Sequence, residues 1–204
     1  AQQGVASQVQ LWPQGELPAA LKDWDDRPVA RITLKPGGQP DPLFAQVLLR
    51  RTPKTDFDTT RPVAPEQLAR LLASAPATPQ PRLHIGGTVA ADQLPALRTL
   101  CWESAQVELL TPRTMMESIH LTRVGPAEIL QHRDGISINS PFVRAVAALG
   151  MFDRTQPPAE GSAAYKSAMG RFEGHSRTAM GFVWITGLNT RSDQVQAGRA
   201  YVRL

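Results

Sequence analysis

The sequence predicts an α+β fold, and three observations support that prediction. Long stretches carry apolar residues at three- and four-residue spacing, and several of them open with proline, which is typical of helices. Short runs of alternating or β-branched residues indicate a few strands. The two kinds of pattern do not alternate regularly, so we do not expect a sheet built from βαβ units.

The first 40 residues predict strands. Residues 5–12 alternate weakly, and residues 28–34 alternate cleanly, with Ala30, Ile32 and Leu34 on one face. That face is expected to be buried, because strict alternation is typical of a half-buried strand. Residues 35–42 contain Pro-Gly-Gly and two more prolines, which makes them the clearest linker in the chain.

A helix is predicted to open at Asp41, a capping residue followed by proline. It would place Arg50 and Thr52 at its C-terminal end. Its buried face would consist of four apolar side chains: Leu43, Phe44, Val47 and Leu48.

The rest of the chain predicts mostly helices. The helix from Pro65 has a regular apolar stripe, and residues 91–133 are mostly helical. Residues 180–185 form a continuous apolar run with β-branched and aromatic members, which predicts a buried central strand. Three further helices are expected at 141–149, at 157–172 and after a cap at Ser192–Asp193.

The segment after the Asp41 helix carries the most distinctive chemistry. Arg50, Arg51, Thr52 and Lys54 place two guanidinium groups, a hydroxyl and an ammonium within five residues. Charge-assisted donors and a short hydroxyl are what a phosphate monoester requires of a protein. The alternative is a solvated basic helix end, where cations meet the negative end of the helix dipole.

The order of residues around this cluster resembles the cofactor-binding entry of the nitroreductase-like flavoproteins. In that family an Arg-x-Ser/Thr-x-Lys/Arg segment precedes an aromatic-Asp pair and a helix that starts Pro-Val-x-x-Glu-x-Leu. Here residues 50–54, then Phe57-Asp58, then residues 62–72 follow the same order. The resemblance implies that Arg50, Thr52 and Lys54 hold the phosphate of FMN and reach the flavin pyrimidine edge. It also implies a central, mainly antiparallel sheet with helices on both faces.

The resemblance extends to the C-terminal half. Asp134-Gly135 is similar to a turn that precedes the family's mobile helical region, and residues 176–204 are similar to its central strand and core helix. The closest pattern is the fused, double-length, Acg-like branch of this bacterial family. Residues 1–40 would then be the tail of a preceding half and 41–204 a second half, incomplete at its C-terminus. The flavin site would lie within a pseudo-dimer of the full chain, or in a homodimer.

The function implied by the resemblance is that of an FMN-dependent oxidoreductase. It would use NAD(P)H to reduce a small aromatic acceptor of the nitro or quinone type, and no side chain here is assigned a catalytic role. One alternative is a non-enzymatic, flavin-sequestering protein, in which residues 109–153 form a lid over the FMN. The other is a structural α+β domain without a cofactor.

Composition weighs against other classes. The net charge of +4 and the pI near 9.7 come from scattered basic residues, so nucleic acid is not an expected partner. No stretch approaches the ~18 apolar residues of a membrane span. One cysteine, Cys101, excludes a multi-thiolate metal site, and Glu117 with His120 supplies only half of a di-iron motif. No metal is therefore expected. The sequence leaves a cytoplasmic or an exported location open.

Overall fold

The computed structural model describes residues 4–18, 20–50, 52–53, 55–75 and 83–204. Helices take up 46% and strands 16% of the structure, which confirms the α+β class. The strands in the described residues pair two by two: β1 with β2 and β3 with β6 antiparallel, and β4 with β5 parallel. These residues therefore hold three two-stranded sheets, and the central sheet implied by the resemblance stays a prediction.

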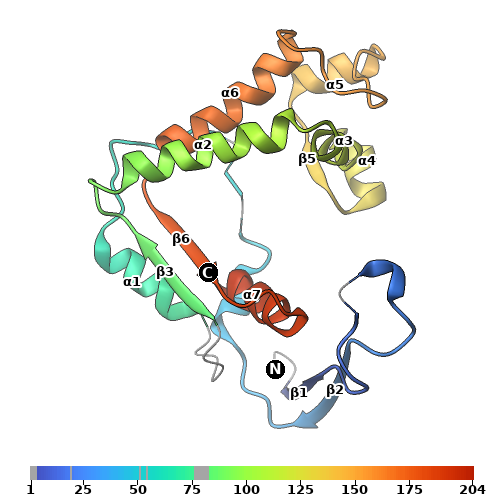
Figure 1. The fold of residues 1–204 in the computed structure, drawn as a ribbon, viewed down its shortest axis with the longest axis vertical. Helices are drawn as coiled ribbons and strands as arrows, with labels where there is room; N and C mark the ends of the chain where they lie inside the picture. The colour runs from blue at the N-terminus through green and yellow to red at the C-terminus, as the bar shows by residue number, and fades with distance from the viewer. Residues whose placement is uncertain (1–3, 19, 51, 54, 76–82) are drawn as a thin grey trace. The chain divides into compact units, whose positions relative to one another are not determined.

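The order of elements follows the chain (Figure 1). The strands are β1 (Val5–Leu11), β2 (Ala30–Pro36), β3 (His84–Thr88), β4 (Thr122–Val124), β5 (Ile136–Ile138) and β6 (Phe182–Thr186). The α-helices are α1 (Pro65–Ser74), α2 (Leu94–Leu110), α3 (Pro112–His120), α4 (Gly125–His132), α5 (Pro141–Ala148), α6 (Ala163–Thr178) and α7 (Arg191–Arg203). Two short 3-10 helices are η1 (Leu21–Asp23) and η2 (Pro42–Gln46).

The chain divides into two compact units that interleave in sequence. Unit 1 contains residues 1–53, 62–90 and 181–204, and unit 2 contains residues 54–61 and 91–180. The halves expected at 1–40 and 41–204 follow a different division and stay a prediction.

The β1–β2 hairpin of unit 1 confirms both strands that the alternation predicted, with Val9 opposite Ile32. The prediction that Ile32 and Leu34 lie on a buried face is wrong, because these side chains are 61% and 67% exposed. Both faces of this pair are largely open. The alternation predicted the strands correctly, but it did not show whether another element packs on them.

The second sheet of unit 1 packs against α1. Leu68 of α1 lies so close to Gly87 of β3 that a Cβ there would come within 3.0 Å of its side chain. On the neighbouring strand, the indole of Trp184 lies over Gly86, its cross-strand partner. Trp184 is nevertheless 39% exposed, so the prediction of a buried strand at 180–185 is wrong. A two-stranded sheet with a helix on it leaves part of each strand open.

Hydrogen bonds tie α7 to distant parts of unit 1. The Trp12 indole donates to Ser192 Oγ at 2.9 Å, and Ser192 N donates to Glu16 Oε1 at 3.2 Å. The cap of α7 is Thr190, not Ser192–Asp193 as the sequence suggested. Asp193 instead occupies the third position of the helix, where its backbone N–H donates to the Thr190 hydroxyl.

Unit 2 is a helical assembly in which α2 and α6 lie side by side (Figure 1). Arg98 of α2 donates to the carbonyl of Ala179, directly after α6, at 2.8 Å. The buried apolar side chains of this unit are Leu94, Leu109 and Met115. The helical character predicted for 91–133 and 141–149 is confirmed, apart from the short parallel pair β4–β5.

The helix expected after Asp41 is much shorter than predicted. Asp41 does cap it, accepting from Leu43 N at 3.0 Å, but η2 is a 3-10 helix that ends at Gln46. Its expected buried face is wrong as well: Phe44 and Leu48 are 55% and 83% exposed. A 3-10 helix repeats every three residues, so it cannot maintain an α-helical apolar stripe.

Candidate functional site

Arg50 and Thr52 lie just beyond η2, as the sequence predicted, although not at the end of a full helix. The Arg50 backbone N–H donates to Gln46 O at 2.9 Å, which adds a final turn after η2. Arg50 Nη1 then donates to Thr52 Oγ1 at 3.2 Å, and both side chains are exposed. Arg51 and Lys54 lie outside the described residues.

The Arg50–Thr52 pair has donor chemistry suited to a phosphate group. The hydroxyl accepts from the guanidinium and still carries its own proton, which it can donate to an anion. A guanidinium beside a hydroxyl offers one charged and one neutral donor on the same short segment. Of the predicted phosphate cluster, these two groups are the part that the structure places together.

The aromatic-Asp pair that follows belongs to unit 2 and has a structural role there. Phe57 N donates to Thr178 Oγ1 at 2.9 Å, and the Phe57 ring lies 6.3 Å from that of His175. Asp58 accepts from the hydroxyl and the backbone N–H of Thr60, and these two hydrogen bonds lower the pKa of Asp58. Together they fix the turn that leads into the next segment of chain.

The helix of the predicted motif forms where expected. Pro65 occupies the first turn of α1, and Gln67 Oε1 accepts from Ala64 N at 2.9 Å. Leu68 and Leu72 are half-buried, whereas Leu71 is exposed at the edge of the stripe. The helix predicted from Pro65 is therefore confirmed, and the cofactor role of this segment stays a prediction.

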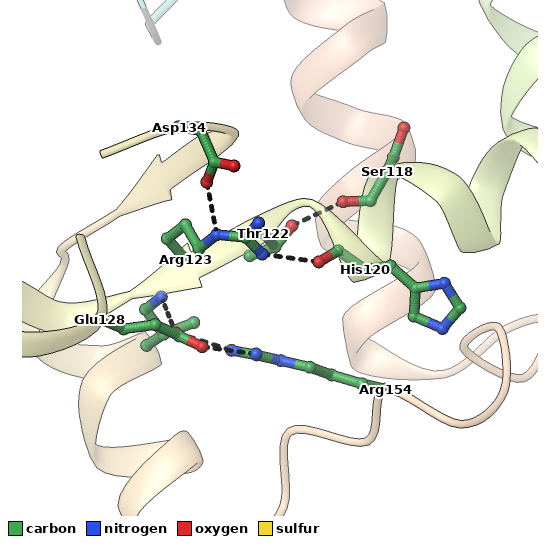
Figure 2. A network of polar contacts seen from close by, with 8 residues as sticks. Ser118, His120, Thr122, Arg123, Glu128, Asp134 and Arg154 are labelled. Atoms are coloured by element: carbon green, nitrogen blue, oxygen red, sulfur yellow. Dashed lines mark hydrogen bonds and ion pairs between the residues drawn. The ribbon is translucent and has the colours of Figure 1, made fainter. Parts of the chain in front are cut away.

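A network of polar contacts in unit 2 surrounds β4 (Figure 2). Arg154 forms a two-pronged ion pair with Glu128 at 2.6 and 2.8 Å, and Val124 N also donates to Glu128. These donors, Arg154 foremost, lower the pKa of Glu128 to about 2. Arg123 donates to Asp134 at 3.0 Å and to the carbonyl of His120 at 2.7 Å.

This network stabilises the packing of unit 2 and is not a ligand site, because its ion pairs join Arg123 to Asp134 and Arg154 to Glu128. It joins α3, β4, α4 and the loop after α5 within unit 2 (Figure 2). Asp134-Gly135, noted in the sequence as a turn, forms part of it. A Cβ at Gly135 would lie 2.1 Å from Leu121 O, and its φ of +72° also favours glycine.

Two of the hollows on the described surface lie in different units, one in each unit. The hollow of unit 2, about 610 Å³, lies between Gly125 and α5, and Arg144 is the one charged residue in its lining. The hollow of unit 1, about 380 Å³, lies at the C-terminal end of β6 and borders the buried carboxylate of Asp193. Neither lining includes Arg50 or Thr52. The sequence indicated Asp193 only as a helix cap, because no local signal marks an adjoining hollow.

Across the described residues, no three His, Cys, Asp or Glu side chains group in a way that could hold a metal ion. Within the same part of the chain, no helix is both long and apolar enough to cross a lipid bilayer.

Comparison with known proteins returned no match to a protein-family model, to a curated protein or to a solved structure.

Proposed function

We propose that this chain binds FMN through the phosphate group, with Arg50 and Thr52 as contacts and Lys54 as a third. The observation that carries the proposal is the hydrogen bond of 3.2 Å between Arg50 Nη1 and Thr52 Oγ1 on an exposed segment. The pair presents a charged and a neutral donor together, which suits the oxygens of a phosphate monoester. We propose the nitroreductase-like architecture, of the fused Acg-like branch, on the residue order described above.

If FMN is bound, it would supply the redox chemistry of such a protein, which is hydride acceptance from NAD(P)H and reduction of a nitro or quinone acceptor. The residues of this chain contribute binding and orientation of the phosphate end. Phosphate binding is therefore the part of the function that rests on the named side chains.

Flavin titration tests the phosphate contact directly. FMN is added to the full chain and its fluorescence quenching is followed. Arg50→Ala should weaken FMN binding by about 2 kcal/mol, roughly 30-fold, because a charge-assisted hydrogen bond is lost. Thr52→Ala should cost about 1 kcal/mol, and Thr52→Ser should retain most of the affinity.

Two controls isolate the phosphate from general charge. Arg31→Ala removes the same charge from an exposed site on β2 and should leave FMN binding unchanged. Riboflavin lacks the phosphate, so it should bind more weakly, and Arg50→Ala should not weaken it further. Equal FMN affinity in the Arg50 and Arg31 variants would refute the assignment.

The same preparation separates the remaining alternatives. A protein that bleaches at about 450 nm within seconds of anaerobic mixing with NADPH acts as an oxidoreductase. A yellow protein that stays oxidised for many minutes fits the flavin-sequestering alternative for that donor. A colourless protein that fails to bind added FMN identifies a structural domain.

A further inference from the structure

The hollow at the end of β6 contains a buried acceptor without a donor. Asp193 is 2% exposed, and its Oδ1 atom has no hydrogen-bond partner in the described part of the chain. Leaving a buried carboxylate oxygen unpaired is costly, because desolvation is not offset by a hydrogen bond. Asp193 borders the hollow of about 380 Å³, a size within the range of small-molecule sites.

The orientation of the carboxylate is fixed by the N-terminus of α7. Asp193 Oδ2 accepts from the Thr190 hydroxyl at 2.6 Å, while Asp193 N donates back to the same hydroxyl at 3.2 Å. This reciprocal pair occupies Oδ2 and leaves Oδ1 without a donor. The carboxylate therefore cannot satisfy both oxygens by rotating within the helix turn.

The other polar groups near this helix end are already engaged. Ser192 N donates to Glu16, and the Arg191 guanidinium lies 5.4 Å from the Trp24 ring centre and donates to Gln194. The Gln194 amide in turn donates to Asn189 Oδ1 at 2.8 Å. The Arg191 guanidinium and the Gln194 amide are thus directed to partners other than Asp193 Oδ1.

The walls of the hollow are largely apolar. Ile185 of β6 and Ala197 of α7 line it together with two leucines, Leu83 and Leu188. Such walls suit a hydrocarbon body, and the unpaired carboxylate oxygen of Asp193 suits a cationic donor at one end. A ligand carboxylate would meet a like charge here, which disfavours acidic ligands.

We propose that this hollow binds a small apolar ligand carrying a primary ammonium group, which donates to Asp193 Oδ1. The proposal is independent of FMN binding at Arg50 and Thr52. An ammonium would supply both the missing hydrogen bond and the opposite charge, while its hydrocarbon body would pack on Ile185 and Leu188.

A series of three probes on the full chain tests the charge requirement. Benzylamine, benzyl alcohol and benzoate share one apolar ring and differ in the polar group. Calorimetry and amide chemical-shift mapping should show saturable binding of benzylamine around β6 and α7, at least tenfold weaker binding of benzyl alcohol, and none of benzoate. The absence of saturable benzylamine binding up to the order of 10 mM would overturn the proposal. Equal affinities across the series would do so as well.

Two variants test the site itself. Asp193→Asn should lose at least tenfold in benzylamine affinity, because the charge is removed while the side-chain shape is kept. Ala197→Leu fills the hollow from α7 without removing any polar group, so it should also abolish binding. Benzylamine affinity unchanged in either folded variant refutes the site. Circular dichroism identifies a variant that does not fold. If Asp193→Asn does not fold, the Ala197→Leu variant and the probe series decide whether the proposed site exists.

Discussion

The ion pair between Glu128 and Arg154 should make the free energy of unfolding depend on pH in the acid range. Two short hydrogen bonds, 2.6 and 2.8 Å, join the carboxylate to the guanidinium, and Val124 N donates to it as well. These contacts lower the pKa of Glu128 from 4.5 to about 2. A carboxylate with a lowered folded-state pKa stabilises the fold above its unfolded-state pKa. That stability is lost as the pH falls from about 4.5 through about 2.

The size of the effect follows from the shift and from the exposure of the pair. Lowering the pKa of Glu128 from 4.5 to about 2 would correspond to about 3.4 kcal/mol if water did not screen the charges. The Glu128 and Arg154 side chains are 24% and 34% exposed, so water screens their interaction in part. We therefore expect ionised Glu128 to stabilise the fold by about 1–2 kcal/mol at neutral pH. The position of Glu128 in the first turn of α4 contributes to this stabilisation through the helix dipole.

The perturbation is Glu128→Gln, which keeps the side-chain shape but removes the charge. Urea unfolding is measured between pH 7 and pH 2 from the NMR signal of the Trp102 indole, which lies in unit 2. The variant should be less stable than the wild type by about 1–2 kcal/mol at pH 7, and the difference should vanish near pH 2. Comparing the two proteins removes the contribution of the other acidic groups that titrate in this range.

Glu173→Gln is the matched control. Glu173 pairs with Arg177 one turn along α6 at 2.6 Å, but the two side chains are 38% and 64% exposed. Its removal should cost only about 0.3–0.5 kcal/mol. A difference between Glu128→Gln and wild type that stays constant from pH 7 to pH 2 would refute the reasoning, because it would show that ionisation of Glu128 does not contribute.

Two further predictions concern backbone and capping positions of unit 2. Gly135→Ala should lower the free energy of unfolding by at least about 3 kcal/mol, because it adds a close contact with a carbonyl to a strained φ. The control is Gly150→Ala, at φ +70° with open space around it. It should lower the free energy of unfolding by only about 1 kcal/mol in the same urea assay. A similar cost for both would show that the contact at Gly135 is relieved by movement. Ser162→Ala removes the cap that accepts from Tyr165 N and should cost about 1 kcal/mol of stability. Ser167→Ala, inside α6, should be neutral or slightly stabilising. Equal effects of the two serine variants would contradict the capping role.

The sequence was a good guide to the positions of elements. Pro65 and Pro141 each occupy the first turn of a helix, and the alternating residues of the first 40 form the β1–β2 hairpin. These features depend on local geometry, since proline fixes φ and alternation fixes which face a side chain occupies. The same local spacing predicted that Arg50 and Thr52 would lie together on a short segment.

Burial was the weaker part of the prediction. Phe44 and Leu48 were expected to face a core, and the β6 strand was expected to be buried, yet these side chains and Trp184 are exposed. A pattern of apolar residues shows which face could be covered, but coverage depends on another element that packs there. Only the folded chain decides whether that element is present.

The sequence by itself determined the α+β class, most element positions and the proximity of Arg50 and Thr52. The tertiary structure decided which distant groups meet: Glu128 with Arg154, Trp12 with Ser192, and Asp193 with the hollow at the end of β6. The physical reason is one of range. Capping, turn and alternation signals act within about four residues along the chain, whereas an ion pair or a pocket requires segments that packing alone brings together.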